Sequence, residues 1–193
     1  MLEEEYQPRR RPPGRSSEPA PEPGFEYALR RAEPQDLPQV LAIYNHYVAN
    51  STVTFDEHPL ALSDLRSKFD QVRGLGFPFL VAESPGGQVL GYAYVFPWKL
   101  RAAYRFTVES SIYLGPAATG KGLGRVLMAE LLDQCRQAGI REIVAVIADQ
   151  GAEASVALHH GFGFTEIGRL GRVGYKFDRW LGTILMQKSL TGR

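Results

Sequence analysis

Hydrophobic residues along the chain recur with two periods, one typical of helices and one typical of strands. Leu60, Leu62, Leu65 and Phe69 repeat at helical spacing, whereas 143–147 is an unbroken apolar run typical of a buried strand. The pattern predicts strands at 25–32, 77–82, 89–96, 106–114, 143–147, 164–167 and 183–187, and helices at 34–48, 60–74, 122–138 and 153–160. Because this order mixes hairpins with helical crossovers, we expect an α/β or α+β fold with a mixed sheet.

Two local signals support this assignment. Ser84, Pro85, Gly86 and Gly87 lie between two apolar runs, a turn composition that favours an antiparallel hairpin. The predicted helix at 122–138 has one apolar stripe and is followed by Gly139, as a helix C-terminus should be. The stripe includes Leu123, Leu127, Leu131, Leu132 and Cys135, so we expect the single cysteine in the core and not as a nucleophile.

Composition divides the chain into a tail and one domain. Six of the 13 prolines fall within residues 1–24, together with four arginines and five glutamates. Such a segment has too few apolar side chains to offset the entropy of ordering, so we expect a disordered tail at 1–24 and a single domain at 25–193. The arginine run within it favours a solvated tail over a nucleic-acid arm.

Charge and hydropathy narrow the classes of function. The 193 residues carry a formal net charge of +1, which argues against a general nucleic-acid or anionic-membrane binder. No apolar run approaches the roughly 18 residues that a membrane span needs, and the N-terminus lacks the apolar region of a signal peptide. We therefore expect a cytoplasmic protein.

The strongest local motif is the glycine-rich stretch 119–125, Thr-Gly-Lys-Gly-Leu-Gly-Arg, between a predicted strand and a predicted helix. Unpaired backbone N–H groups and the helix dipole favour anions there, and glycines let the backbone approach a phosphate. A P-loop would need Ser or Thr where Gly122 stands, and the spacing of the glycines differs from G-x-G-x-x-G. A simple helix-capping turn and a coenzyme A site remain as alternatives.

The coenzyme A interpretation rests on a resemblance. Residues 119–124 resemble the Q/R-x-x-G-x-G/A pyrophosphate loop of the GNAT N-acetyltransferase superfamily, although Thr119 replaces the usual Gln or Arg. Residues 152–164 resemble its motif N-x-x-S-x-x-L-Y/H-x-x-x-G-F, although Ala152 stands in the asparagine position. The resemblance implies a mostly antiparallel, twisted central sheet flanked by helices, with acetyl-CoA as co-substrate. We expect no metal, because His159 and His160 are adjacent on a predicted helix and no Cys, Asp or Glu at ligand spacing accompanies them.

Four further segments narrow the resemblance within this superfamily. Residues 43–47, 51–55, 97–104 and 107–113 look like those of phosphinothricin and methionine sulfoximine acetyltransferases, and the match extends over about 26–188. It implies transfer of acetyl to the α-amino group of a small amino acid or analogue, usually by a homodimer. Two other classes remain open: acetylation of another small amine or a protein N-terminus, and a non-catalytic acyl-CoA sensor.

Glu109 is the candidate general base. If 106–114 is a strand, Glu109 and Ser111 point to one face and Ser110 and Ile112 to the other. A half-buried carboxylate next to the cofactor loop can take a proton from an ammonium group, whereas the alternative is an exposed edge strand with Glu109 in solvent. We expect direct attack by the freed amine, without an acyl-enzyme.

His159 lies where the superfamily motif carries Tyr or His, close to the expected thiolate leaving group. Its ordinary pKa near 6.5 suits a general-acid or a base-assisting role. His160, by contrast, is expected only to complement a helix dipole. The hypothesis assigns cofactor binding to Ile112, Tyr113, Leu114, Gly120, Lys121, Gly122, Leu123, Gly124, Arg125 and Ser155.

Two cations follow the third apolar strand. Lys99 and Arg101 suggest a receptor for a carboxylate or another oxoanion, although two solvated loop cations are the alternative. A free α-carboxylate is absent from a protein N-terminus, so this pair favours an amino acid. The predicted substrate-binding residues are Phe55, Lys99, Arg101, Tyr104, Glu109, Ser110 and Ser111, and residues 174–180 resemble a family loop that approaches the substrate.

Overall fold

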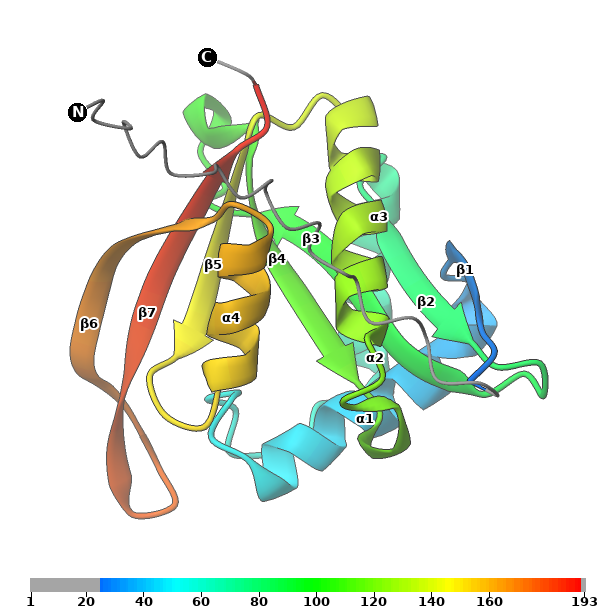
Figure 1. The fold of residues 1–193 in the computed structure, drawn as a ribbon, viewed down its shortest axis with the longest axis horizontal. Coiled ribbons are helices and arrows are strands. Elements are labelled where there is room, and N and C mark those ends of the chain that lie inside the picture. Colours follow the sequence, from blue (N-terminus) through cyan, green and yellow to red (C-terminus); the bar gives the residue numbers. More distant parts are fainter. Residues whose placement is uncertain (1–24, 192–193) are drawn as a thin grey trace, which may run out of the picture.

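The computed structural model describes residues 25–191, so the predicted tail at 1–24 and the last two residues lie outside it. A seven-stranded sheet has the order β1-β2-β3-β4-β5-β7-β6 (Figure 1). Its strands are β1 (Ala28–Arg31), β2 (Phe79–Glu83), β3 (Val89–Pro97), β4 (Thr107–Leu114), β5 (Glu142–Ala148), β6 (Thr165–Lys176) and β7 (Arg179–Ser189). The mixed, mostly antiparallel sheet and the order of its elements confirm the fold class.

Helices cover both faces of the sheet (Figure 1). They are α1 (Leu37–Asn50), α2 (Leu62–Gly74), α3 (Leu123–Gln137) and α4 (Glu153–Gly161), with short 3-10 turns at Pro34–Asp36, Ala102–Tyr104 and Pro116–Ala118. Successive side chains of β2 point to opposite faces of the sheet and enter two hydrophobic clusters. Leu80 packs into the cluster that contains α3, and Val81 packs into the cluster that contains α1 and α2. Cys135 is fully buried in the α3 cluster, as expected, and burial raises the pKa of its thiol to about 12. Within residues 25–191, no helix is both long and apolar enough to cross a membrane.

The β4–β5 contact is the one parallel pairing in the described sheet, and it is short. Only Thr107, Val108 and Glu109 pair with β5, opposite Glu142, Ile143 and Val144. Beyond Glu109 the two strands diverge, and Figure 1 shows them opening as a V. On its other side β4 stays paired with β3 from Val108 to Leu114. The sheet is therefore continuous at one end and open at the other.

The last two strands are longer than the sequence pattern predicts. The expected strands at 164–167 and 183–187 extend to Thr165–Lys176 and Arg179–Ser189, joined by a two-residue turn. Both turn residues, Phe177 and Asp178, have positive φ (51° and 58°), a conformation for which a glycine would be expected. A register shift between Leu170 and Gly174 also interrupts the alternation along β6. These two irregularities account for the missed length.

The turn end of this hairpin holds the segment that follows α1. Lys176 is only 2% exposed, and its Nζ donates to the backbone oxygens of Ser51 and Thr54, both at 2.8 Å. Gly174 lies against Phe55, where an added Cβ would come within 2.4 Å of the ring. A side chain at 174 would therefore displace Phe55, and the hairpin fixes the position of residues 51–55.

Lys176→Met tests this anchor. It leaves two carbonyl oxygens without a charged donor, so we expect the free energy of unfolding to fall by about 2–4 kcal/mol. Chemical denaturation measures the change, and Lys188→Met, on β7, is the control because Lys188 is a half-buried strand lysine with no side-chain hydrogen bond in the described region. Equal stability of the two variants would show that Lys176 does not hold the loop.

Candidate functional site

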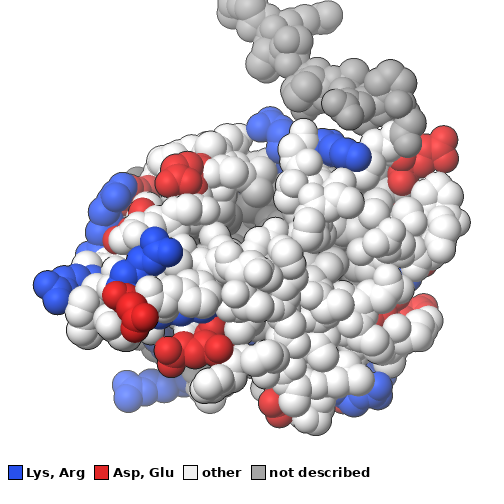
Figure 2. All heavy atoms as spheres, turned by 90° about the horizontal axis from the view of Figure 1, so that it is seen from below, with Lys and Arg blue, Asp and Glu red and all other residues white. Residues whose placement is uncertain are grey.

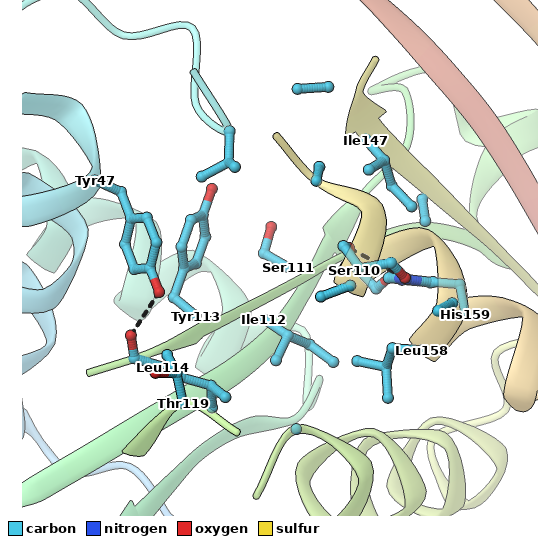
Figure 3. Close-up of a pocket in the computed structure, with 18 of the residues that line it drawn as sticks. Tyr47, Ser110, Ser111, Ile112, Tyr113, Leu114, Thr119, Ile147, Leu158 and His159 are labelled. Carbon is cyan, nitrogen blue, oxygen red and sulfur yellow. Dashed lines mark hydrogen bonds between the residues drawn. The ribbon is translucent and has the colours of Figure 1, made fainter. Parts of the chain in front are cut away.

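A cleft of about 630 Å³ opens where β4 and β5 separate. Its walls come from β4, from the end of β5, from the glycine loop before α3 and from α4 (Figure 3). Figure 2 views the molecule from the side towards which the V opens: the surface is hollowed there, and most charged side chains lie around it. The cleft is thus a consequence of the strand divergence and is lined largely by uncharged groups.

The edge of β4 that faces the cleft has backbone groups available for a ligand. Trp98 N–H donates to Thr107 O and Gly115 N–H donates to Leu90 O, so the odd-numbered residues direct their backbone groups towards β3. By alternation, Ser110, Ile112 and Leu114 direct theirs towards the opening. Leu114 O accepts a 2.7 Å bond from Tyr47 Oη (Figure 3). An extended ligand with amide groups can pair with this edge as a strand would.

The glycine loop has the geometry of an anion site at the start of α3. Gly120 and Gly122 have φ of +75° and +79°, and Gly122 caps the helix without a side-chain hydrogen bond. Arg125 N–H donates to Gly122 O, which leaves the amides of Leu123 and Gly124 available to an anion in the field of the helix dipole. Arg125 adds a positive charge to the cleft wall. Thr119 also lines the cleft, but its hydroxyl donates to Pro116 O at 3.0 Å.

One buried polar atom in the wall has no partner among the described residues. The Oγ of Ser110 is inaccessible and makes no hydrogen bond, which is costly unless a ligand supplies one. Together with the free β4 edge and the uncapped helix, this atom fits a long ligand that carries amides and phosphates. Acetyl-CoA has both, so the residues present fit this donor.

Glu109 is the last residue of β4 that pairs with β5, and it lies where the cleft begins. Its side chain is half-buried, and burial raises the pKa of the carboxyl above its ordinary value. The positive charges of Lys68 and Lys99 act in the opposite direction. A carboxylate of raised proton affinity at a cleft mouth is suited to accept a proton.

His159 reaches the cleft from α4 and is 5% exposed. Its Nδ1 lies 2.7 Å from Ser155 O, and because a carbonyl only accepts, Nδ1 must donate the hydrogen. Burial lowers the pKa of the imidazole. The neutral ring therefore carries its proton on Nδ1 and has a lone pair on Nε2.

The cleft gathers most of the residues predicted from the sequence. Of these it is lined by Glu109, Ser110, Ser111, Ile112, Tyr113, Leu114, Gly120, Gly122, Gly124, Arg125, Ser155 and His159. Two predicted cofactor residues do not line it: Lys121 lies over the ring of Phe25 at 4.7 Å, and Leu123 is fully buried in the core. The side chain of Leu123 packs inwards because it is the first apolar position of the α3 stripe.

The four predicted acceptor residues outside β4 also lie away from the cleft lining. Phe55 packs on Gly174, Lys99 places its Nζ 4.5 Å from the centre of the Trp98 ring, and Arg101 and Tyr104 are exposed. Sequence reasoning missed several lining residues, among them Tyr47 and Val53. Nothing in the helical stripe of α1 distinguishes Tyr47 from a core aromatic.

Among the described residues, no group of three or more His, Cys, Asp or Glu could hold a metal ion.

The fold and the cleft indicate a class: proteins with a split sheet whose cleft suits an acyl-CoA. Comparison with known families and proteins agrees. Residues 40–164 match the model of the acetyltransferase (GNAT) family, and the chain belongs to this family. It is an acetyltransferase that uses acetyl-CoA as co-substrate.

Relatives narrow the family further. The chain is 42% identical over 162 residues to phosphinothricin N-acetyltransferase of Alcaligenes faecalis, covering 84% of this chain and 82% of the relative. It is 40% identical to the L-methionine sulfoximine/L-methionine sulfone acetyltransferase of Pseudomonas aeruginosa, covering 84% and 94%. An acetyltransferase of Salmonella typhimurium, solved with acetyl-CoA, superimposes with a TM-score of 0.83 at 37% identity, covering 88% of this chain and 96% of that one.

Gly122→Ala tests the anion site. A left-handed conformation is strained for alanine, so the loop must shift its amides, and we expect the KM for acetyl-CoA to rise about tenfold. Gly139→Ala is the matched control, because Gly139 follows the other end of α3 with φ of +76° and open space around it. Steady-state kinetics and denaturation distinguish the two effects. An equal change of KM in both variants would contradict the assignment.

Proposed function

We propose that this protein transfers acetyl from acetyl-CoA to the α-amino group of a small amino acid or analogue, of the kind represented by phosphinothricin and methionine sulfoximine or sulfone. The observation that carries the proposal is Glu109, a half-buried carboxylate at the point where the cleft begins. The names of the relatives at about 40% identity support the substrate class. Because the reaction consumes acetyl-CoA, we propose that the protein acts in the cytoplasm.

In the proposed mechanism, Glu109 takes a proton from the α-ammonium group of the acceptor, directly or through a water molecule. Acetyl-CoA supplies the activated acetyl group as a thioester. The reaction forms the amide N–C bond and breaks the C–S bond, and a proton goes to the departing sulfur. The backbone edge at Ile112 to Leu114 and the amides at Gly120, Gly122 and Gly124 hold the donor, while β4 orients its reactive end towards Glu109.

His159 assists as a base or as an orienting acceptor. The neutral ring, with Nδ1 committed to Ser155 O, offers only Nε2 to the substrate side. A ring held neutral by burial is a poor proton donor to a thiolate, so we assign it no general-acid role. Ser110 Oγ, on the face of β4 covered by α3 and α4, is assigned to a polar group of the donor.

The acceptor side is assigned to Ser111 in the cleft and to four residues outside the cleft lining. Ser111 lines the cleft, and Lys99 and Arg101 lie on the segment that joins β3 to β4. These cations suit an anionic or strongly polar end of the acceptor. Phe55 and Tyr104 are assigned to apolar contacts with the acceptor side chain. Residues 174–180 form the turn end of the β6–β7 hairpin, where Gly174 lies against Phe55.

Glu109→Gln tests the base. It keeps the size of the side chain but removes the proton acceptor, so we expect kcat to fall by about 100-fold or more while the KM for acetyl-CoA changes little. In the unsubstituted protein, activity should rise with pH through the raised pKa of Glu109, because only the ionised form accepts a proton. This rise of activity with pH should be absent in Glu109→Gln.

Glu142→Gln is the control, since Glu142 lies on β5 opposite Thr107 and outside the cleft lining. An unchanged pH–rate profile for Glu109→Gln would refute the assignment. Thiol release across a panel of amino acids, simple amines and an N-terminal peptide identifies the acceptor class. Release with the peptide alone would favour a protein N-terminus, and no release with any amine would favour an acyl-CoA sensor.

We also propose that the protein is a homodimer whose contact includes the β6–β7 hairpin. β6 is an edge strand, and Figure 1 shows the hairpin at one side of the sheet. Large apolar side chains are about half exposed on it: Ile167, Leu170, Val173, Tyr175, Phe177 and Trp180. A second copy would cover both the apolar patch and the unpaired strand edge.

Substitution of Trp180 by lysine tests the dimer. A charge at the centre of an apolar contact is costly, so the variant should elute as a monomer while the unsubstituted protein elutes as a dimer, measured by light scattering after size exclusion. Leu75→Lys is the control, because Leu75 is 53% exposed on a different element. A monomeric unsubstituted protein would exclude the proposed contact.

A further inference from the structure

Lys68 is a cation near the candidate base that the sequence motifs do not mark. It lies on α2 and is half-buried, with its Nζ 5.8 Å from the ring centre of Tyr94 and 5.9 Å from that of Phe96. Both distances are within the range of a cation–π contact. Among the described residues, no carboxylate lies within ion-pair distance of it. A partly desolvated ammonium group over two rings is therefore available to an anion from outside the chain.

Lys68 lies outside the cleft lining, but the register of β3 and β4 relates it to two residues of that lining, Glu109 and Ser111. Phe96 is the direct partner of Glu109, and Tyr94 is the direct partner of Ser111. Side chains of such partners stand about 4.5–5.5 Å apart on one face of a sheet. Lys68 thus lies over the β3 residues adjacent to Glu109 and Ser111. In agreement, it has the largest effect of any charge on the pKa of Glu109, ahead of Lys99.

We propose that Lys68 binds the α-carboxylate of the acceptor while Glu109 faces its α-ammonium group. The inference rests on the proposed function and makes it more specific: the acceptor must be an amino acid with a free carboxylate. An amino acid carries a positive and a negative group on the same carbon atom, and the protein presents a negative group on β4 and a positive group on α2. Such matching orients the amine as well as binding it.

Lys99 and Arg101 are then assigned to a polar or anionic group at the far end of the acceptor side chain. Lys99 has its ammonium group on the Trp98 ring, and Arg101 is exposed on the segment after β3. Lys68, by contrast, is the cation over the rings that flank Glu109 and Ser111. The carboxylate is bonded to the same carbon as the amine, so its receptor must lie close to the base.

Lys68→Met is the test variant, assayed with L-methionine sulfone and with its α-carboxamide, which lacks the negative charge. We expect the KM for the acid to rise about tenfold or more, the size of a lost charge-assisted hydrogen bond, while the KM for the amide changes less than about twofold. Lys68→Arg should retain most of the preference for the acid. Arg66→Met, an exposed position on the same helix, removes the same charge and should change neither KM.

Two results would overturn the inference. One is an equal rise of KM for acid and amide. The other is an unchanged KM for the acid together with a pH–rate profile displaced to higher pH, which would mean that Lys68 acts only through the charge of Glu109. Calorimetric binding of L-methionine sulfone to the CoA-saturated protein adds a readout that needs no turnover.

This binding measurement separates the two proposals. Suppose that the unsubstituted protein binds the amino acid without releasing thiol, and that Lys68→Met weakens this binding. The assignment of Lys68 to the α-carboxylate is then supported, and the proposed reaction is contradicted. If the unsubstituted protein and Lys68→Met both turn over with the same KM for the amino acid, the proposed reaction is supported and the role of Lys68 in binding the acceptor is contradicted. If the unsubstituted protein neither binds nor acetylates the amino acid, both proposals are contradicted.

Discussion

The site depends on the shortness of one strand pairing. β4 and β5 share three pairs of residues and then separate, while β3 holds β4 straight along its other side. Had the parallel ladder continued, β5 would have occupied the backbone groups of Ile112 and Leu114. The separation exposes polar backbone inside the molecule, where it is costly unless something pairs with it. In the proposed mechanism, the acetyl donor pairs with these backbone groups in place of β5.

The same strand divides the chemistry between its two faces. Ser110, Ile112 and Leu114 belong to the side covered by α3 and α4, where the glycine loop and His159 also lie. Glu109, Ser111 and Tyr113 belong to the side covered by α1 and α2, where Tyr113 joins an aromatic cluster with Tyr44, Tyr47 and Tyr92. In the proposed mechanism, the donor and the acceptor therefore approach β4 from opposite sides.

Sequence reasoning recovered those parts of the site that depend on local rules. The period-2 pattern of β4 is enough to separate Glu109 from Ser110, and the glycines before α3 mark a backbone that must adopt positive φ. Lys68 could not be found in this way, because it contacts β3 through the packing of α2 on the sheet. The β6–β7 turn was missed because Phe177 and Asp178 have positive φ although neither is a glycine.

The two-sided arrangement of β4 has a consequence for how such enzymes diversify. The groups proposed to hold the donor are mainly backbone amides, which most substitutions leave intact. The groups proposed for the acceptor are side chains on α2, on the segment after β3 and on the loop that Lys176 holds in place. A lineage can therefore exchange one amine for another by altering a few peripheral side chains, and it inherits the machinery for activated acetyl unchanged.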